Sequence, residues 1–185
     1  MTDRLYQNAT KLLHDLKEKG FEISAPVDVD QVAEMLGISV EMDFSLDDDQ
    51  IVGQILFSND KPVVRINPVE NSYEPRRRFT LAHEIGHFCL HAAISKRGFT
   101  DSRKTMSRSE SYWDVYESEA NGFAAQLLMP KTLLVAEGNQ IISNYLNKNN
   151  VKSMPSSVFV DLMASKFNVS NKAMEYRLKN LKILK

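Results

Sequence analysis

Residues 83–87 read His-Glu-Ile-Gly-His, and this HExxH pattern constrains the fold more than any other stretch of the chain. The pattern needs a helix, because residues four apart then lie on one face and both imidazoles can reach a single metal ion. His83 and His87 are the predicted ligands, and Glu84 lies close enough to act on a water molecule beside the metal. The pattern therefore predicts a helical metal site of the zinc-peptidase type.

The flanking sequence supports a buried helix around the motif. Pro75 suits the first helical position, where a missing N–H costs nothing, and no further proline follows before His91. Apolar residues fall on both sides of this helix, so we expect it to be buried. Gly86 costs the helix about 1 kcal/mol relative to alanine, and we interpret it as room for a substrate backbone beside the metal.

A second helix is predicted to carry the third metal ligand, because a catalytic zinc site usually has three protein ligands. Residues 116–130 repeat apolar residues at helical spacing and end at Pro130. Glu117 and Asn121 share one face of this helix. That arrangement resembles thermolysin-like enzymes, and the resemblance implies that Glu117 binds the metal while Asn121 steadies a ligand histidine. Glu119, which lies off that face, is the reserve ligand.

Two further residues near the motif are expected to have no metal role. His91 lies four residues beyond His87, but Leu90 and Ala93 stand where a metzincin has its glycine and third histidine. We expect His91 to face the helix carbonyls or solvent at the end of the helix. Cys89, the one cysteine, is expected to be a small buried apolar residue.

Two long segments resemble the ImmA/IrrE family of bacterial and phage metallopeptidases. They read RFTLAHEIGHFCLH over residues 78–91 and ESEANGFAAQLLMP over residues 117–130, and the similarity is densest over residues 62–130. The resemblance implies a zinc-dependent protease of the kind found in mobile elements. It also implies a protein substrate, a helix-turn-helix (Xre-type) transcriptional repressor, whose cleavage changes transcription.

Composition fits an ordinary cytoplasmic enzyme. The 185 residues suit one domain, and a net charge of −1 gives no overall attraction to nucleic acid. No apolar run approaches the ~20 residues that a membrane span needs, and the polar N-terminus has no signal-peptide core. A single cysteine argues against a disulfide-stapled secreted protein. We therefore expect a cytoplasmic location and no membrane partner.

The expected fold is α+β, with one metallopeptidase domain over residues 1–185. A small mixed or antiparallel sheet of about three strands should pack on the HExxH helix and the second ligand helix, with further helices at both ends. The expected regions are N-terminal helices at 1–37 (the first over 3–19), the sheet at 38–67, the catalytic core at 72–130 and C-terminal helices at 131–185.

Three strands are predicted within the sheet region, over residues 38–42, 51–57 and 62–66. Asn59-Asp60-Lys61 favours a hairpin turn between the last two. Extended substrates of zinc peptidases pair with an edge strand, so strand 51–57 or residues 63–67 could bind substrate in this way, or both could be interior strands.

Residues 95–111 form a polar segment with a net charge of +3 between the two metal motifs. We interpret it as a flexible loop, either a flap that covers the cleft or a plain surface loop. The metal site also needs a second group to stabilise the developing oxyanion. Tyr112, Tyr116 or an arginine of this loop could supply it.

The C-terminal residues 158–181 predict a helix, a turn and a second helix capped by Ser170. Helix pairs of this kind bind DNA in some proteins and only close the core in others. Arg177 and several lysines add positive charge here, whereas Asn168 replaces the usual turn glycine. Two alternatives to peptidase function therefore stay open, namely a module that binds a repressor without hydrolysis and a DNA-binding regulator that uses these helices.

Overall fold

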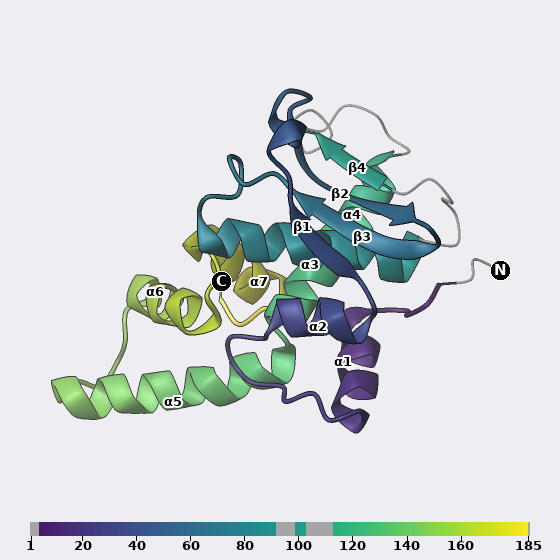
Figure 1. Ribbon diagram of the computed structural model, residues 1–185. Coiled ribbons are helices and arrows are strands. Elements are labelled where there is room, and N and C mark those ends of the chain that lie inside the picture. The colour runs from purple at the N-terminus through teal and green to yellow at the C-terminus, as the bar shows by residue number, and fades with distance from the viewer. Residues whose placement is uncertain (1–3, 92–98, 103–112, 185) are drawn as a thin grey trace.

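The computed structural model describes residues 4–91, 99–102 and 113–184, and this part of the chain has an α+β fold. A small sheet lies in the upper part of the molecule against α3, and most of the other helices lie below it (Figure 1). In chain order the elements are α1 (Ala9–Glu18), α2 (Val29–Met35), β1 (Ser39–Met42), the 3-10 helix η1 (Phe44–Asp47), β2 (Ile51–Ser58), β3 (Lys61–Ile66), α3 (Glu74–His91), β4 (Phe99–Ser102), α4 (Trp113–Leu128), α5 (Lys131–Asn149), α6 (Ser156–Phe167) and α7 (Asn171–Asn180).

The sheet is mixed and its strand order is β1-β3-β2-β4. β1 pairs parallel with β3, whereas β2 pairs antiparallel with both β3 and β4. Asn59 and Asp60 form the tight turn between β2 and β3 with φ values of 51° and 62°, which short polar residues tolerate. The predicted hairpin is therefore confirmed.

The strand order bears on two expectations about the sheet. β2 and β3 each have a partner on both sides, so of the two alternatives left open both are interior strands, and neither is an edge strand open to substrate. The sheet also has a fourth strand, β4, within the segment that we expected to be an irregular loop. A short polar strand of this kind has no hydrophobic alternation to reveal it. The rest of that expected loop, residues 95–98 and 103–111, lies outside the described residues.

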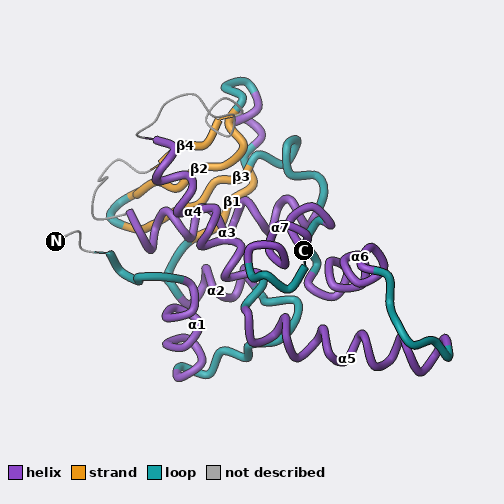
Figure 2. The backbone as a smooth tube through the Cα atoms, turned by 180° about the vertical axis from the view of Figure 1, so that it is seen from behind, coloured by secondary structure: helices purple, strands orange, loops and turns teal. Residues whose placement is uncertain are grey.

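The helix α3 lies between the sheet and α4 and is buried on several sides, as the apolar pattern predicted (Figures 1 and 2). Leu81, Ile85 and Cys89 of this helix have no exposed surface. They join one core cluster with Val64 of the sheet and Phe123 of α4. This packing holds the HExxH residues in fixed rotamers between two layers.

The first helix begins later than we expected. α1 starts at Ala9 instead of residue 3, because the Asn8 side chain accepts a hydrogen bond from the backbone N–H of Lys11 and caps the helix there. The residues before it run past the end of α3, where the backbone N–H of Tyr6 donates to the carbonyl of Cys89 at 3.2 Å. The N-terminal segment therefore reaches the last turn of α3, the HExxH helix.

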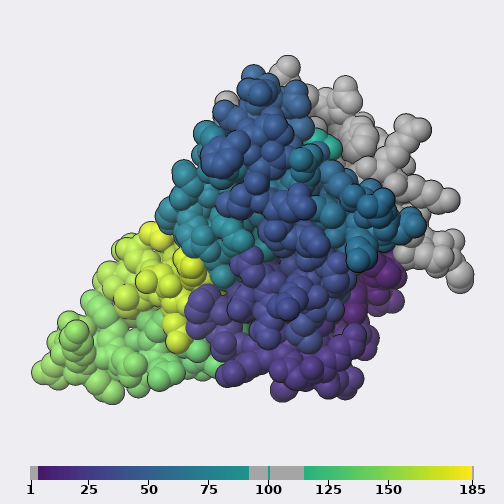
Figure 3. All heavy atoms as spheres, viewed as in Figure 1, coloured from purple at the N-terminus to yellow at the C-terminus, as the bar shows by residue number. Residues whose placement is uncertain are grey.

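The C-terminal helices form a projecting lobe at one side of the molecule (Figure 3). Asn168 ends α6 in the left-handed conformation with φ 49°, and the Ser170 side chain caps α7, as predicted. Arg177 donates to the carbonyl of Met129 at 3.1 Å, so this arginine is a tie between α7 and the end of α4.

A second arginine connects the lobe to α3, the HExxH helix. Arg78 of α3 is buried and donates to the carbonyl of Val27 at 2.7 Å and to that of Asn168 at 3.3 Å. One guanidinium thus joins the N-terminal part, α3 and the turn between α6 and α7. Within the part of the chain that the structure describes, we find no helix with the length and apolarity to cross a membrane.

Candidate metal centre

The donor atoms of three side chains meet between α3 and α4. His83 and His87 lie one turn apart on α3, and Glu117 approaches them from α4. The Nε2 atoms of the two histidines are 2.9 Å apart. Glu117 places Oε2 at 3.2 Å from Nε2 of His83 and Oε1 at 3.2 Å from Nε2 of His87. All three side chains are buried.

These separations fit a metal ion. Donor atoms about 2.0–2.2 Å from a tetrahedral zinc ion stand about 3.3–3.6 Å from one another. The two histidine–glutamate distances of 3.2 Å lie close to that range, and the histidine–histidine distance of 2.9 Å is about half an ångström shorter. Two imidazoles and one carboxylate are also the donor set of several catalytic zinc sites. The residues present therefore suit a metal.

The charge of Glu117 suits the same role. Burial raises the pKa of its carboxyl, but hydrogen bonds with His83 and His87 outweigh burial and lower that pKa to about 2. The carboxylate is thus ionised at neutral pH, which is the form that binds a cation.

Each histidine has a partner on its far nitrogen. Nδ1 of His83 lies 3.1 Å from Oδ1 of Asn121, which is the contact that we predicted for this asparagine. Nδ1 of His87 lies 3.1 Å from Nδ1 of His91. A partner on Nδ1 fixes the ring orientation and leaves the lone pair of Nε2 for a metal. Both Nε2 atoms are thereby directed at Glu117.

The expectation for His91 was wrong. Its side chain is fully buried, and both ring nitrogens meet other side chains, since Nε2 lies 2.9 Å from Oε2 of Glu119. Burial lowers the pKa of His91, and the hydrogen bond with Glu119 partly offsets that shift. Glu119, the reserve ligand, instead pairs with His91 and with Arg4. A histidine four residues after the motif was visible in the sequence, but its neighbours come from α4 and the N-terminal segment.

Glu84 is fully buried beside strand β2. Its Oε1 lies where a side chain on Gly53 would stand, since an added Cβ there would be 3.0 Å from Oε1 and 2.6 Å from Cγ2 of Thr80. Only glycine fits this approach between β2 and α3. Gly53 therefore lets the sheet close directly over the carboxylate of the motif.

Gly86 serves helix packing, and the expectation that it makes room for substrate was wrong. A Cβ at this position would lie 3.1 Å from the carbonyl oxygen of Ala120, 3.2 Å from its Cα and 3.3 Å from Cβ of Phe123. The space beside Gly86 is thus filled by the backbone of α4. The missing side chain brings α4, and with it Glu117, close to the two histidines.

Of the residues predicted to stabilise an oxyanion, the structure describes Tyr116. Tyr116 packs edge-on against the ring of His91, with ring centroids 4.7 Å apart. Tyr112 and the arginines of the expected loop lie outside the described residues.

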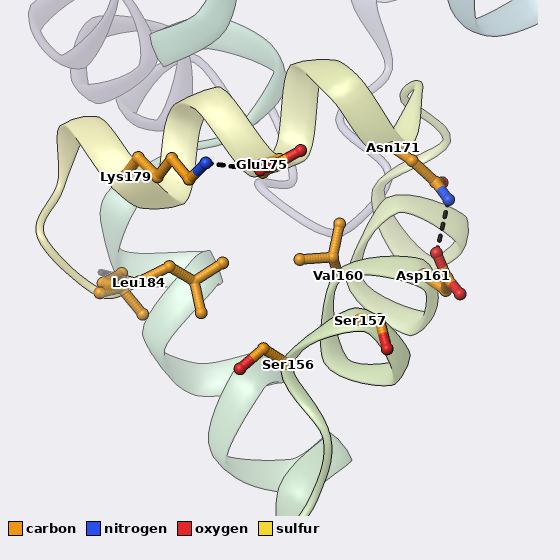
Figure 4. A pocket seen from close by; sticks show the side chains of 9 residues that line it. Ser156, Ser157, Val160, Asp161, Asn171, Glu175, Lys179 and Leu184 are labelled. Carbon is orange, nitrogen blue, oxygen red and sulfur yellow. Dashed lines mark hydrogen bonds and ion pairs between the residues drawn. The ribbon is translucent and has the colours of Figure 1, made fainter.

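A cavity of about 660 Å³ lies away from this centre, among the C-terminal helices (Figure 4). Its described lining residues all fall within 156–184. The Glu175–Lys179 ion pair of 2.6 Å and a hydrogen bond from Asn171 to Asp161 stand at its wall. Because α3 and α4 contribute none of those residues, this cavity is separate from the metal centre.

An HExxH helix, a glutamate from the next helix and a small mixed sheet over them are the arrangement of a metallopeptidase domain. The chain belongs to the peptidase family described as the IrrE N-terminal-like domain, which matches residues 33–179. The resemblance to ImmA/IrrE proteins is thereby confirmed.

The fold is also similar to one solved structure of a Mycobacterium tuberculosis transcriptional regulator. The two share 17% sequence identity with a TM-score of 0.55, and the match covers 96% of this chain and 48% of that one. This chain thus spans about half the length of that protein, and at this identity the likeness concerns the fold alone. A comparison with curated proteins found no match.

Proposed function

We propose that this protein is a zinc-dependent endopeptidase whose metal is held by His83, His87 and Glu117. The observation that carries the proposal is the meeting of these three donors, two of which lie on the same HExxH helix as the buried Glu84. Two histidines and one carboxylate also suit iron. The position of Glu84 within HExxH favours hydrolysis, and therefore zinc.

The residues of the chain would divide the work as follows. Zinc in this site supplies Lewis-acid chemistry, polarising the scissile carbonyl and making a neighbouring water more acidic. Glu84 accepts the proton of the attacking water and passes it to the leaving amine. Asn121 holds His83 in the orientation that presents Nε2, and Glu117 adds negative charge that offsets the cation.

An extended substrate segment would pair with β4. This strand stands at one end of the strand order, and its residue Asp101 is in register with Gly53 of β2. Gly53 in turn lies against Glu84.

The proposed substrate is a helix-turn-helix repressor of the Xre type, in a cytoplasmic setting. Membership of the IrrE-like peptidase family supports this choice of substrate class.

The test is incubation of the protein and zinc with the helix-turn-helix repressor encoded beside its gene, with Glu84→Gln as the matched control. We expect wild type to cut the repressor at one site and Glu84→Gln to retain metal without cutting. His83→Ala and Glu117→Ala should both lose the metal, measured by metal analysis after dialysis. Cutting by Glu84→Gln at the wild-type rate would contradict the role of Glu84.

Two other functions are distinguished by the same experiment. Tight binding of the repressor without cutting, equal in wild type and Glu84→Gln, would favour a module that sequesters the repressor. Sequence-specific gel shifts by this protein alone would favour a DNA-binding regulator. In α7, however, Arg177 is directed to a backbone carbonyl and Lys179 pairs with Glu175, so two of the expected cations are already engaged.

A further inference from the structure

A continuous chain of side-chain contacts runs from the metal centre to the N-terminal segment. It begins at His87, whose Nδ1 lies 3.1 Å from Nδ1 of His91. Nε2 of His91 lies 2.9 Å from Oε2 of Glu119. The carboxylate of Glu119 then receives hydrogen bonds of 2.8 and 2.9 Å from Arg4.

The donors and acceptors available fix the direction of each hydrogen bond in this series of side chains. If Nε2 of His87 offers its lone pair to a metal, the proton of that ring is on Nδ1. His87 then donates to Nδ1 of His91, which must be an acceptor and must carry its own proton on Nε2. That proton is donated to Glu119, which also accepts two hydrogen bonds from Arg4. Each group satisfies the next.

The surroundings hold the middle of the chain in place. His91 has no exposed surface, and Tyr116 packs edge-on against its ring. The hydrogen bond from the N–H of Tyr6 to the carbonyl of Cys89 fixes the N-terminal segment on the last turn of α3. Arg4 and Glu119 are about one-third exposed, so the outer end of the chain reaches solvent.

The outer end also lies beyond the family domain. That domain matches residues 33–179, and Arg4 precedes it. The carboxylate and both histidines come from inside the match, whereas the cation that completes the chain comes from a segment that is additional to it.

We propose that His91 and Glu119 are positioning residues for the metal ligand His87, and that Arg4 makes the N-terminal segment part of the support of the metal site. The inference deepens the proposed function, because it rests on the metal site proposed above, but it does not require peptidase activity. It assigns a role to the N-terminal segment, namely tuning the affinity for the metal.

The test compares zinc affinity in Glu119→Ala, Glu119→Gln and Arg4→Ala, by competition with a chromogenic chelator. Loss of the hydrogen-bond partner of a ligand histidine typically lowers metal affinity by about 10- to 100-fold. Glu119 acts on His87 through His91, so we expect a fall of about tenfold for Glu119→Ala, at the lower end of that range. Glu119→Gln keeps an acceptor oxygen and should restore most of that loss. Arg4→Ala removes a partly exposed ion pair and should weaken binding by about two- to five-fold.

A matched control is Asp30→Ala, which removes the ion pair between Asp30 and Arg77. This pair is not part of the hydrogen-bond series that includes the histidines. It should leave zinc affinity unchanged, whereas a general stability effect would lower affinity in this variant too. Thermal unfolding of the metal-free variants checks that each one folds.

A second measurement tests the hydrogen-bond relay, meaning the series His87–His91–Glu119–Arg4, independently of the proposed metal site. Nitrogen chemical shifts of the imidazoles report which nitrogen carries the proton, with or without zinc. We expect Nδ1–H for His87 and Nε2–H for His91 in wild type, and a mixture of tautomers for both in Glu119→Ala. Wild-type protein with these tautomers but no zinc binding would refute the metal site and support the relay. Unchanged tautomers and unchanged zinc affinity in Glu119→Ala would overturn the relay.

Discussion

Replacing Gly86 by alanine should separate the stability of the fold from the integrity of the metal centre. Two effects on the free energy of unfolding oppose each other. Alanine in a helix interior is about 1 kcal/mol more favourable than glycine. The new Cβ, however, would lie 3.1–3.3 Å from Ala120 and Phe123, and ordinary contacts begin at 3.4 Å. Overpacking of this kind costs about 1–3 kcal/mol.

The net loss of stability should therefore be about 0–2 kcal/mol, whereas the metal site should suffer more. Backbone atoms of Ala120 cannot rotate away, so α4 must move by a few tenths of an ångström. Glu117 precedes Ala120 by less than one turn and moves with it. Ligand distances in metal sites tolerate about 0.2 Å. We expect zinc affinity to fall by about tenfold or more, measured by chelator competition.

Gly122→Ala is the matched control on α4. A Cβ there would meet nothing within 4 Å, so this variant should gain about 0.4–1 kcal/mol and bind zinc like wild type. Denaturant unfolding of both metal-free variants gives the stabilities. If Gly86→Ala were stabilised as much as Gly122→Ala and bound zinc normally, the close approach of the two helices would not be what places Glu117.

Three more predictions follow from individual contacts. Gly53→Ala should lower both stability, by about 1–3 kcal/mol, and peptidase turnover, because its Cβ would collide with Thr80 and press on Glu84; urea unfolding and a cleavage assay measure the two. Cys89 should resist alkylation in the folded protein and react fully in denaturant, since burial raises its pKa and excludes reagent. The hydrogen bond from Arg77 lowers the pKa of Asp30 below its usual 3.8, so the stability that this pair contributes is present above that pH and is lost as pH falls through the folded value. The difference in unfolding free energy between wild type and Asp30→Asn, about 0.5–1 kcal/mol at neutral pH, should shrink in acid.

Features with local signals could be predicted from the sequence. The turn at Asn59 and Asp60, the cap at Ser170 and the spacing of His83 and His87 each depend on residues within one turn of chain. The residues that stabilise each of these features are therefore close together in the sequence. Asn8 carried a similar capping signal, and overlooking it placed the start of α1 too early.

Features that depend on distant segments could not be predicted in this way. His91 is buried because α4 brings Glu119 and the N-terminal segment brings Arg4, and no spacing in the sequence encodes either approach. The neighbour of Gly86 is likewise a backbone from another helix. The order of strands depends on which segments cross in space, and the polar β4 offered no alternation to place it.

The hydrogen bonds of these two arginines affect which residues can be substituted during evolution. Arg78 donates to the backbone carbonyls of Val27 and Asn168, and Arg177 donates to that of Met129. Every amino acid carries that carbonyl, so mutation of the acceptor residue leaves the acceptor atom in place, whereas mutation of the donor removes the bond. Among relatives with this fold we therefore expect the two arginines to persist while their partners change, and a search for co-varying pairs would miss both ties.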